Sequence, residues 1–507
     1  MPPGNSEVPM PGSTKLPIVY VRGFAGDTKG IDKSVKDPFY GFNEGSTHVR
    51  VGAGNVPSFH QFESPLLRLI LDEDYKILVE GGQDAYLDSH DSIPSHSIWV
   101  LRFYDASAST WGTEPKEFRI EDAAADLLTL VDKLREKSGA PRVHLVAHSM
   151  GGLICRCLLQ KVLPDAGRDP ADCVEKVFTY GSPHGGITFD AGFGLFERVR
   201  DVTGLNGAEI FGPERMYEYL TSTTDLDPDG RPPDWRARDM PERDSAHPKA
   251  FPLSRIFCLV GTNPKDYDVA FGLSAAVVGA HSDGLVQIEN AYVPGTHRAF
   301  VHRSHSGRYG LVNSEEGYQN LRRFLFGDRK VEATLTGCRL PAIEGTTWQA
   351  EVRLSVRGLP IVMHEQTAEH WCPVQLPSSG DLADVPLTTA FLCSGLRPHG
   401  SDTTMRYALQ LRILSLREQR GFLSFGDHLE QTPDFDDTLV VDIGEGTWAT
   451  WNSLIPGTIR NHEPGGASLR DEDSGEGSWM AHIPLPDSAK ALLGDQARIR
   501  LAVTGWT

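Results

Sequence analysis

The sequence has no hydrophobic run long enough to cross a membrane, and it has little positive charge. The longest apolar stretch, Val269 to Ala280, is far shorter than the roughly 18 to 20 residues that span a bilayer. The 49 basic and 68 acidic side chains leave a formal net charge of −19, and no local cluster of Lys and Arg offsets it. Such a field repels nucleic-acid phosphates and anionic membrane surfaces. We therefore expect no transmembrane segment and no nucleic-acid partner.

Cysteine is also scarce, with seven residues in the whole chain. Cys155 and Cys157 stand two positions apart on one predicted helix, where their side chains point to different faces and cannot form a disulfide. Residues 1–15 contain no basic start followed by an apolar run, so we expect a flexible tail and no secretory signal. These features favour buried free thiols and a cytoplasmic location, unless the start Met was added to a mature secreted chain.

The remaining composition is that of a core-forming globular protein. Hydrophobic residues make up 39% of the chain and charged residues 23%. The 51 Gly and 34 Pro amount to about one residue in six, which is below the level typical of low-complexity chains. A length of 507 residues, at roughly 150 residues per domain, indicates two or three domains.

Strand-like and helix-like segments alternate over residues 16–328. An amphipathic helix is predicted over 120–138, because its apolar positions recur at three- and four-residue spacing and Gly139 follows it. This alternation predicts an α/β fold with a mainly parallel sheet and helices on both faces. Short apolar runs predict buried strands at 17–21, 97–104, 143–147, 176–180, 255–260 and 299–302.

Two insertions interrupt this α/β domain. The first, at about 27–95, carries one helix signal, in which Ser64 is a capping residue and Pro65 takes the first helical position. The second, at about 187–250, is weakly amphipathic at its start and rich in Asp, Arg and Pro further on. We expect both insertions to lie outside the core sheet.

The helix signal fades after residue 328, and residues 329–507 predict a C-terminal β domain. Apolar residues alternate with polar ones along three segments, which is the period of a half-buried strand. Clusters of Gly, Pro, Asp and Ser separate the strands and favour an antiparallel sandwich over a barrel. The alternating segments are 348–356, 405–413 and 497–503.

A serine lies between one of the predicted strands and a following helical pattern. Ala147 and Gly151 stand two residues before and two residues after Ser149. Small residues at both places are what a strained strand-to-helix elbow requires, because that turn brings neighbouring backbone close and exposes the hydroxyl. A serine before glycine can also be a simple helix cap. The flanking strand and helix favour a nucleophile, although glycine is more usual than alanine at the earlier place.

Four blocks of sequence together resemble the lipase and esterase branch of the α/β-hydrolase family, of the bacterial lipase-like kind. The resemblance covers about the first 328 residues in scattered segments. It implies an α/β-hydrolase fold and a triad in the chain order Ser, Asp, His, with Ser149 as nucleophile, Asp283 as acid and His305 as base. The blocks are VRGFAG at 21–26, AHSMGG at 147–152, GSPHGG at 181–186, and SDGLV at 282–286 with SHSGRYGLVN at 304–313.

Other residues compete for these roles. Asp266 and Asp268 follow the strand at 255–260 more directly than Asp283 does, and Asp283 is also compatible with an ordinary turn before glycine. His302 is the rival base, although its place suits a strand-end structural residue, and His281 would line the acid loop. His148 and His184 stand inside two of the blocks quoted above, and we interpret them as hydrogen-bonded scaffolding.

The resemblance also implies an oxyanion hole formed by two backbone N–H groups, those of Phe24 and Met150. Arg22 departs from the family pattern, in which histidine is common at this place. Because the donors are main-chain groups, this departure bears on the packing of the turn more than on its chemistry. The sequence does not identify the partner of Arg22.

The sequence gives little support for a metal or a cofactor. One group, His364, His370 and Cys372, lies close in sequence but lacks a second ligand pair of recognised spacing, so we expect a structural role. An acidic group is compatible with calcium but lacks the EF-hand pattern and suits a solvated turn; it comprises Asp434, Asp436 and Asp437. No glycine loop has the nucleotide-binding pattern, and the expected chemistry needs no cofactor.

We therefore expect a serine carboxylic-ester hydrolase, a lipase or esterase, acting on a small-molecule or lipid ester with peripheral lipid-surface contact. Residues 187–250 take the place of a cap or lid in the resembling lipases, or form a surface decoration. The stretch 269–280 would line an acyl pocket or pack in the core. Two alternatives stay open. One is an acyltransferase or amidase with the same triad, and the other is a non-catalytic binding protein that retains the fold.

Overall fold

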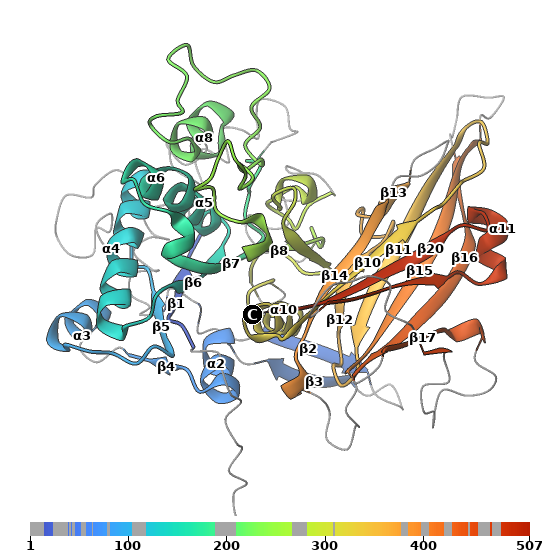
Figure 1. The fold of residues 1–507 in the computed structure, drawn as a ribbon, viewed down its shortest axis with the longest axis horizontal. Helices are drawn as coiled ribbons and strands as arrows, with labels where there is room; N and C mark the ends of the chain where they lie inside the picture. Colours follow the sequence, from blue (N-terminus) through green and yellow to red (C-terminus); the bar gives the residue numbers. More distant parts are fainter. Residues whose placement is uncertain are drawn as a thin grey trace, which may run out of the picture.

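The structure is a computed structural model, and Figure 1 shows an α/β part beside a β part. Among the described residues, no helix is long and apolar enough to cross a membrane. All seven cysteines are described and carry free thiols. The described residues are 15–23, 39, 42, 46–51, 57–62, 64–78, 82–103, 118–187, 209–265, 281–307, 310–376, 384–396, 405–419, 428–444, 447–454, 467–468 and 478–506.

The α/β part is built on a seven-stranded sheet in the order β4-β5-β1-β6-β7-β8-β9. Every neighbouring pair in this sheet is parallel, as the alternation of strands and helices predicts. Each predicted apolar run contributes a strand, and every residue of the strands at 18–21, 97–100 and 256–261 is buried. The strands are β1 (Ile18–Val21), β4 (Lys76–Ile77), β5 (Ser97–Val100), β6 (Val143–His148), β7 (Val174–Tyr180), β8 (Ile256–Gly261) and β9 (His297–Val301).

Helices cover both faces of this sheet. The helix predicted over 120–138 is confirmed as α4 (Ile120–Ser138), and Gly139 ends it with a φ of 69°. Helix α5 (Gly151–Cys157) follows β6 and continues through a π-helical turn into α6 (Leu163–Asp165). These helices lie on one side of the sheet in Figure 1, and α10 (Glu315–Phe326) lies on the other.

The first insertion contains more structure than its sequence predicts. Ser64 accepts a hydrogen bond from the Leu67 amide at 3.2 Å and caps α2 (Pro65–Glu73), which confirms the predicted helix. The expectation that this insertion lies outside the core sheet is wrong for β4, which pairs with β5 at the edge of that sheet. The sequence does not indicate β4, because two residues are too short to show a period. The other unpredicted elements are the antiparallel ribbon of β2 (Ser46–Val51) and β3 (Pro57–Phe62), and α3 (Gln83–Ser89).

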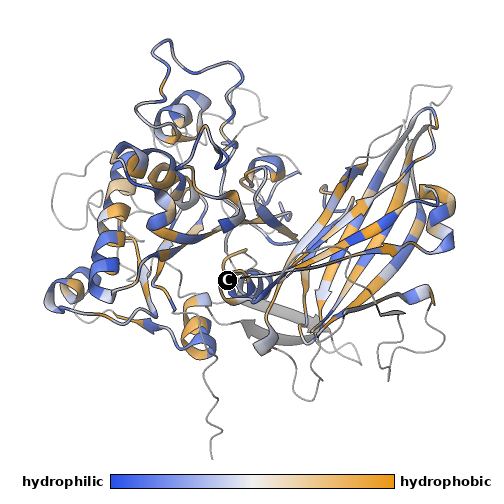
Figure 2. Cartoon of the chain, viewed as in Figure 1, coloured by the Kyte–Doolittle hydropathy of each residue, from blue (hydrophilic) through white to orange (hydrophobic). Residues whose placement is uncertain are grey.

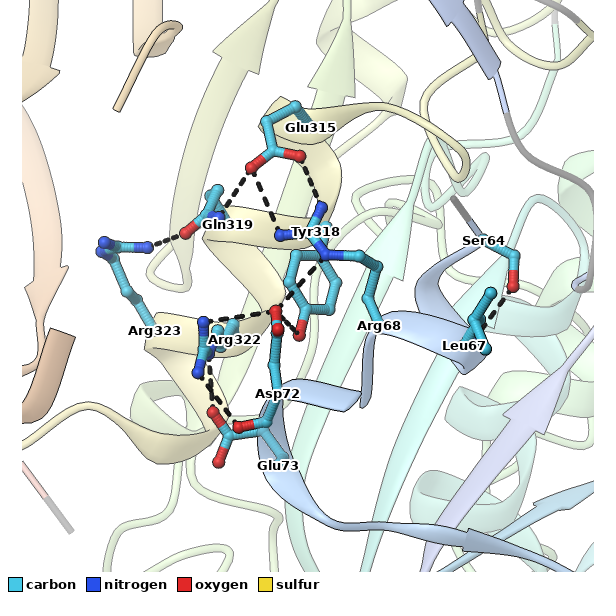
Figure 3. Close-up of polar contacts among 10 residues, drawn as sticks. All are labelled: Ser64, Leu67, Arg68, Asp72, Glu73, Glu315, Tyr318, Gln319, Arg322 and Arg323. Carbon is cyan, nitrogen blue, oxygen red and sulfur yellow. Dashed lines mark hydrogen bonds and ion pairs between the residues drawn. The ribbon is translucent and has the colours of Figure 1, made fainter. Parts of the chain in front are cut away.

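A polar network holds α2 against α10 (Figure 3). Arg68 pairs with Glu315 at 2.6 Å, and its guanidinium lies 4.1 Å from the centre of the Tyr318 ring. The Tyr318 hydroxyl donates to Asp72 at 2.9 Å. Through these contacts the first insertion braces α10, which follows the loop that carries His305.

The described part of residues 329–507 forms antiparallel sheets, as predicted. Figure 2 shows hydrophobic and hydrophilic residues alternating along the strands. One sheet has the order β14-β10-β20-β19, and the other β12-β11-β15-β16-β17-β18, with β13 pairing β11. The bounds are β10 (Arg329–Thr336), β11 (Thr346–Val356), β12 (Val362–Gln366), β13 (Val374–Leu376), β14 (Val385–Leu392), β15 (Met405–Gln419), β16 (His428–Ile443), β17 (Thr447–Trp451), β18 (Ala467–Ser468), β19 (Ser478–Pro484), α11 (Asp487–Leu493) and β20 (Arg498–Gly505).

The β part has its own hydrophobic core and also packs on the α/β part. Buried side chains of both sheets form this core, such as Leu335 and Leu501 from one and Leu354 and Leu409 from the other. At the chain end, the Trp506 indole N–H donates to the Phe324 carbonyl at 2.7 Å. The two parts are therefore in direct contact at the end of α10.

Candidate active site

Ser149 occupies a strained turn between β6 and α5. Its φ of 55° lies in the left-handed region, which few residues other than glycine adopt. A Cβ atom on Gly151 would lie 2.2 Å from the Val21 carbonyl oxygen, and one on Gly23 would lie 2.4 Å from the Ser149 Cβ. The turn therefore closes only because neighbouring residues have no side chain, as the elbow motif requires.

His305 and Asp283 form a buried pair. Their side chains are joined by a contact of 2.9 Å between His305 Nδ1 and Asp283 Oδ2. The His305 amide also donates to the Asp283 carbonyl at 2.8 Å. Because the carboxylate accepts a hydrogen bond from Nδ1–H, the Nε2 atom carries the lone pair that a base needs.

Backbone amides donate hydrogen bonds to the other carboxylate oxygen of Asp283. Asp283 Oδ1 accepts from the amides of Leu285 at 3.0 Å and Val286 at 2.8 Å. Hydrogen bonds to the charged form of a carboxylate stabilise it. The Asp283 carboxylate is thus fixed in place beside the imidazole.

The GSPHGG block connects the serine turn to this pair. The Ser149 amide donates to the carbonyl of Tyr180 at 2.9 Å. The next residue is Gly181, on which a Cβ would lie 2.8 Å from Asp283 Oδ2 and 3.2 Å from His305 Nδ1. The three residues predicted as a triad therefore gather at the carboxyl ends of neighbouring parallel strands, where α/β sheets place their sites.

The histidines predicted as scaffolding lie around the pair and are neutral. His148 Nε2–H donates to the His305 carbonyl at 2.9 Å, and burial lowers the pKa of His148 to about 3, with the charges of His305 and Arg22 adding to the effect. His184 faces the Thr179 hydroxyl at 3.2 Å. Burial, followed by the nearby charge of Arg156, holds the pKa of His184 well below its usual range.

The competing residues are placed differently. His302 stacks on His370 with ring centroids 3.8 Å apart, and His281 stacks on Trp371 at 4.5 Å, so both histidines face the β part. Met150 is buried at the start of α5, where backbone N–H groups have no acceptor within the helix. The other candidates lie outside the described residues, namely Phe24, Asp266, Asp268 and the apolar stretch 269–280.

A buried arginine that the sequence did not single out attaches the second insertion to the site. Arg156 of α5 donates to the carbonyls of His184 at 3.0 Å, Ala237 at 2.7 Å and Asp239 at 2.8 Å. Burial lowers its pKa to about 10. The described part of this insertion, 209–250, also contains α8 (Pro213–Leu220), which lies against α5. Residues 188–208 lie outside the described part of the chain.

The side chains considered as metal ligands have protein partners. Asp434 accepts from the Ser415 amide at 2.8 Å, and Asp437 accepts from the amide of Ser453 at 3.2 Å. Asp436 pairs with Arg412 at 3.2 Å. Across the described ranges, no group of three or more His, Cys, Asp or Glu side chains is arranged to hold a metal ion.

Comparison with known proteins identifies the fold. Residues 95–174 match the family described as alpha/beta hydrolase fold. No curated protein matches the chain. Among solved structures, the chain is similar to lipase BlEst2 of Bacillus licheniformis in its propeptide form, with 12% identity, coverage of 88% of this chain and 97% of that one, and a TM-score of 0.33.

Two further structures give similar values. The mature form of the same lipase is 15% identical, and the match covers 63% of this chain and 94% of the lipase chain, with a TM-score of 0.32. Phospholipase PlaB of Legionella pneumophila, in complex with thio-NAD, is 12% identical, covers 90% of this chain and 100% of its own, and has a TM-score of 0.32. The family match falls on β5, α4, β6 and α5, the elements that lead into and out of the serine turn, and with the parallel sheet it confirms that the protein has the α/β-hydrolase fold.

Proposed function

We propose that the protein is a serine hydrolase that cleaves carboxylic esters through an acyl-enzyme on Ser149. The observation that supports this most strongly is the buried pair of His305 and Asp283, joined at 2.9 Å and linked to the residue before Ser149 by the hydrogen bond from His148 to the His305 carbonyl. A serine hydroxyl is a weak nucleophile until a base and an orienting acid activate it. The arrangement supplies both groups.

In the proposed mechanism, His305 Nε2 takes the Ser149 proton as the hydroxyl oxygen attacks the ester carbonyl carbon. Asp283 holds the imidazole and stabilises its charged form. The tetrahedral intermediate collapses, the C–O bond to the alcohol breaks, and His305 returns the proton to the departing oxygen. Water, deprotonated by the same imidazole, then attacks the acyl carbon. The bond between that carbon and Ser149 Oγ breaks, the acid leaves, and His305 returns the proton to Oγ.

The negative charge of each intermediate needs fixed donors. We assign these to the backbone N–H groups of Met150 and Phe24, following the family resemblance. Losing the alignment of one such donor costs about a hundred- to a thousandfold in rate. Since the donors belong to the main chain, the turn beside Gly23 matters more than the side chain at position 22.

The substrate class follows from the same site. We propose a small-molecule or lipid ester, with residues 187–250 acting as a cap that shields the acyl group from water. The described part of this segment, 209–250, is attached to α5 by Arg156, which supports a place beside the nucleophile.

Hydrolysis of p-nitrophenyl esters from acetyl to palmitoyl tests this proposal. We expect turnover with an initial burst of p-nitrophenol, and a loss of about 10⁴-fold or more in kcat for Ser149→Ala. Ser89→Ala is the matched control, because Ser89 is an exposed serine at the end of α3. No turnover of any ester by the wild-type chain, or full activity in Ser149→Ala, would contradict the proposal.

A further inference from the structure

We propose that a loop of the β part, Thr367–Cys372, positions the acid and the base of the active site. This inference rests on the proposed function, since it assigns a role in that same reaction. It gives this one loop of the β part a role in the reaction, and Trp371 and His370 are its positioning residues.

Two ring stacks join this loop to the two loops that carry the acid and the base. The Trp371 and His281 rings have centroids 4.5 Å apart and an interplanar angle of 26°. The His370 and His302 rings are 3.8 Å apart at 13°. His281 stands two residues before Asp283, and His302 stands three residues before His305. Each stack therefore contacts the chain immediately ahead of one member of the pair.

The acid loop, residues 281–288, is a closed turn, so a contact at His281 also restrains the position of Asp283. The Ile288 amide donates to the His281 carbonyl at 3.0 Å, and the Asp283 amide donates to the Val286 carbonyl at 3.2 Å. Cys372 belongs to the same buried apolar cluster as Val286 and Phe300. The loop thus stacks on His281 at the start of the acid turn and shares an apolar cluster with Val286 further along it.

The loop itself is fixed to the β part. The Ala368 amide donates to Glu351 Oε1 at 2.9 Å, and the Trp371 amide donates to the Ala368 carbonyl at 3.1 Å. Glu351 is buried on β11 and is also paired with Arg412. A rigid support of this kind can hold a partner loop in one place.

Trp371 has two features that packing stability does not explain. Its φ of 59° lies in the left-handed region, which is costly for a residue with a bulky side chain. The side chain remains 55% exposed although it is large and apolar. The strained backbone presents the indole to His281, which is the contact that the proposal needs.

The geometry of the pair makes the reaction sensitive to this support. A displacement of about 1 Å in a catalytic group can cost on the order of a hundredfold in rate. The carboxylate stabilises the protonated imidazole, so a loosened acid loop should move the acidic limb of the rate profile to lower pH. We therefore expect an effect on kcat and on its acidic pH limb, and little effect on KM.

The test compares two variants with wild type. One is Trp371→Gly, and the other combines Trp371→Gly with His370→Ala. Glycine tolerates the positive φ, so Trp371→Gly removes the ring without adding strain. We expect about a tenfold lower kcat, a KM within about twofold, and an acidic limb moved to lower pH. Trp371→Phe keeps an aromatic ring and should restore most of the activity. Leu454→Ala, at another exposed apolar side chain of the β part, is the control that should behave as wild type.

A second readout does not need turnover. The proton shared by His305 Nδ1 and Asp283 gives a far-downfield ¹H NMR signal, and we expect both variants to weaken or broaden it. A folded double variant with wild-type kcat, acidic limb and downfield signal would overturn the inference. Failure of the proposed function looks different, because the wild-type chain would then hydrolyse no ester, while the NMR comparison would still test the loop.

Discussion

At the scale of single residues, the site depends on positions that have no side chain. A Cβ on Gly23 would lie 2.4 Å from the Ser149 Cβ and 3.0 Å from its Oγ. We expect Gly23→Ala to displace the nucleophile and to lower kcat by about a hundredfold. Gly167→Ala is the control, since its Cβ would meet nothing within 4 Å, while its φ of 72° should cost about 1 kcal/mol of stability. Equal kcat values in the two variants would refute the packing argument.

The residues of the site differ in how far the sequence could identify them. Ser149 has a local signal, because the small residues beside it and the flanking strand and helix indicate an elbow. Asp283 and His305 came from family resemblance, since an aspartate before glycine and a loop histidine are common in any chain. The role of Gly181 against the Asp283–His305 pair was not foreseen, although the GSPHGG block marked its place.

At the scale of elements, strong periodicity was the reliable signal. Helix α4 and strands β11, β15 and β20 follow apolar patterns that local sequence displays, and all four are confirmed. Strand β4 has two residues and no period. The contacts of Arg156 with Ala237 and of Trp371 with His281 join distant segments, and their formation depends on how whole loops pack.

Arg156 provides a prediction about the second insertion. Arg156→Met would leave the carbonyls of His184, Ala237 and Asp239 without their donor. Buried acceptors that lose a partner cost about 1 to 3 kcal/mol each, so we expect the free energy of unfolding to fall by at least about 2 kcal/mol. Urea unfolding measures this change, and limited proteolysis should cut within 225–247 faster.

Arg236→Met is the matched control for this experiment, because Arg236 is exposed in the same segment. It should change neither the unfolding midpoint nor the cleavage rate. If Arg156→Met unfolds and is cleaved as the wild-type chain is, Arg156 does not hold the insertion in place.

At the scale of the whole molecule, buried histidines in both parts predict a loss of stability in acid. Burial lowers the pKa of His144 and His148 to about 3, and that of His297 and His364 to about 4, and nearby positive charges add to the effect. Below pH 6.5 the unfolded chain binds protons at these residues and the folded chain does not. Stability therefore falls as the pH decreases from 6.5 toward 4, by about 1.4 kcal/mol per pH unit for each histidine.

Urea unfolding at pH 7.5 and pH 5.5 measures this dependence. The wild-type chain should be less stable at the lower pH, and His144→Leu should lose less stability between the two values, because one proton-binding site of the unfolded state is gone. Equal stability at both values would contradict the assignment of neutral buried histidines.

At the same scale, the β domain is joined to the hydrolase fold in two places. It contacts the α/β part at the end of α10 through Trp506, and the loops that carry Asp283 and His305 through Trp371 and His370. The sequence predicts a β domain at 329–507 but does not indicate these contacts, because residues that stack across distant segments leave no periodic pattern in the local sequence. The contacts of Trp371 and His370 are the ones through which the β domain affects the proposed reaction.

Labelling with a fluorophosphonate probe, followed by mass spectrometry of the peptides, tests the central claim most directly. The probe reacts with a serine only when a base activates it. We predict one adduct on Ser149, absent from Ser149→Ala and present in Ser89→Ala. Labelling that persists in Ser149→Ala, or a wild-type chain that takes up no probe, would contradict an activated nucleophile at the elbow.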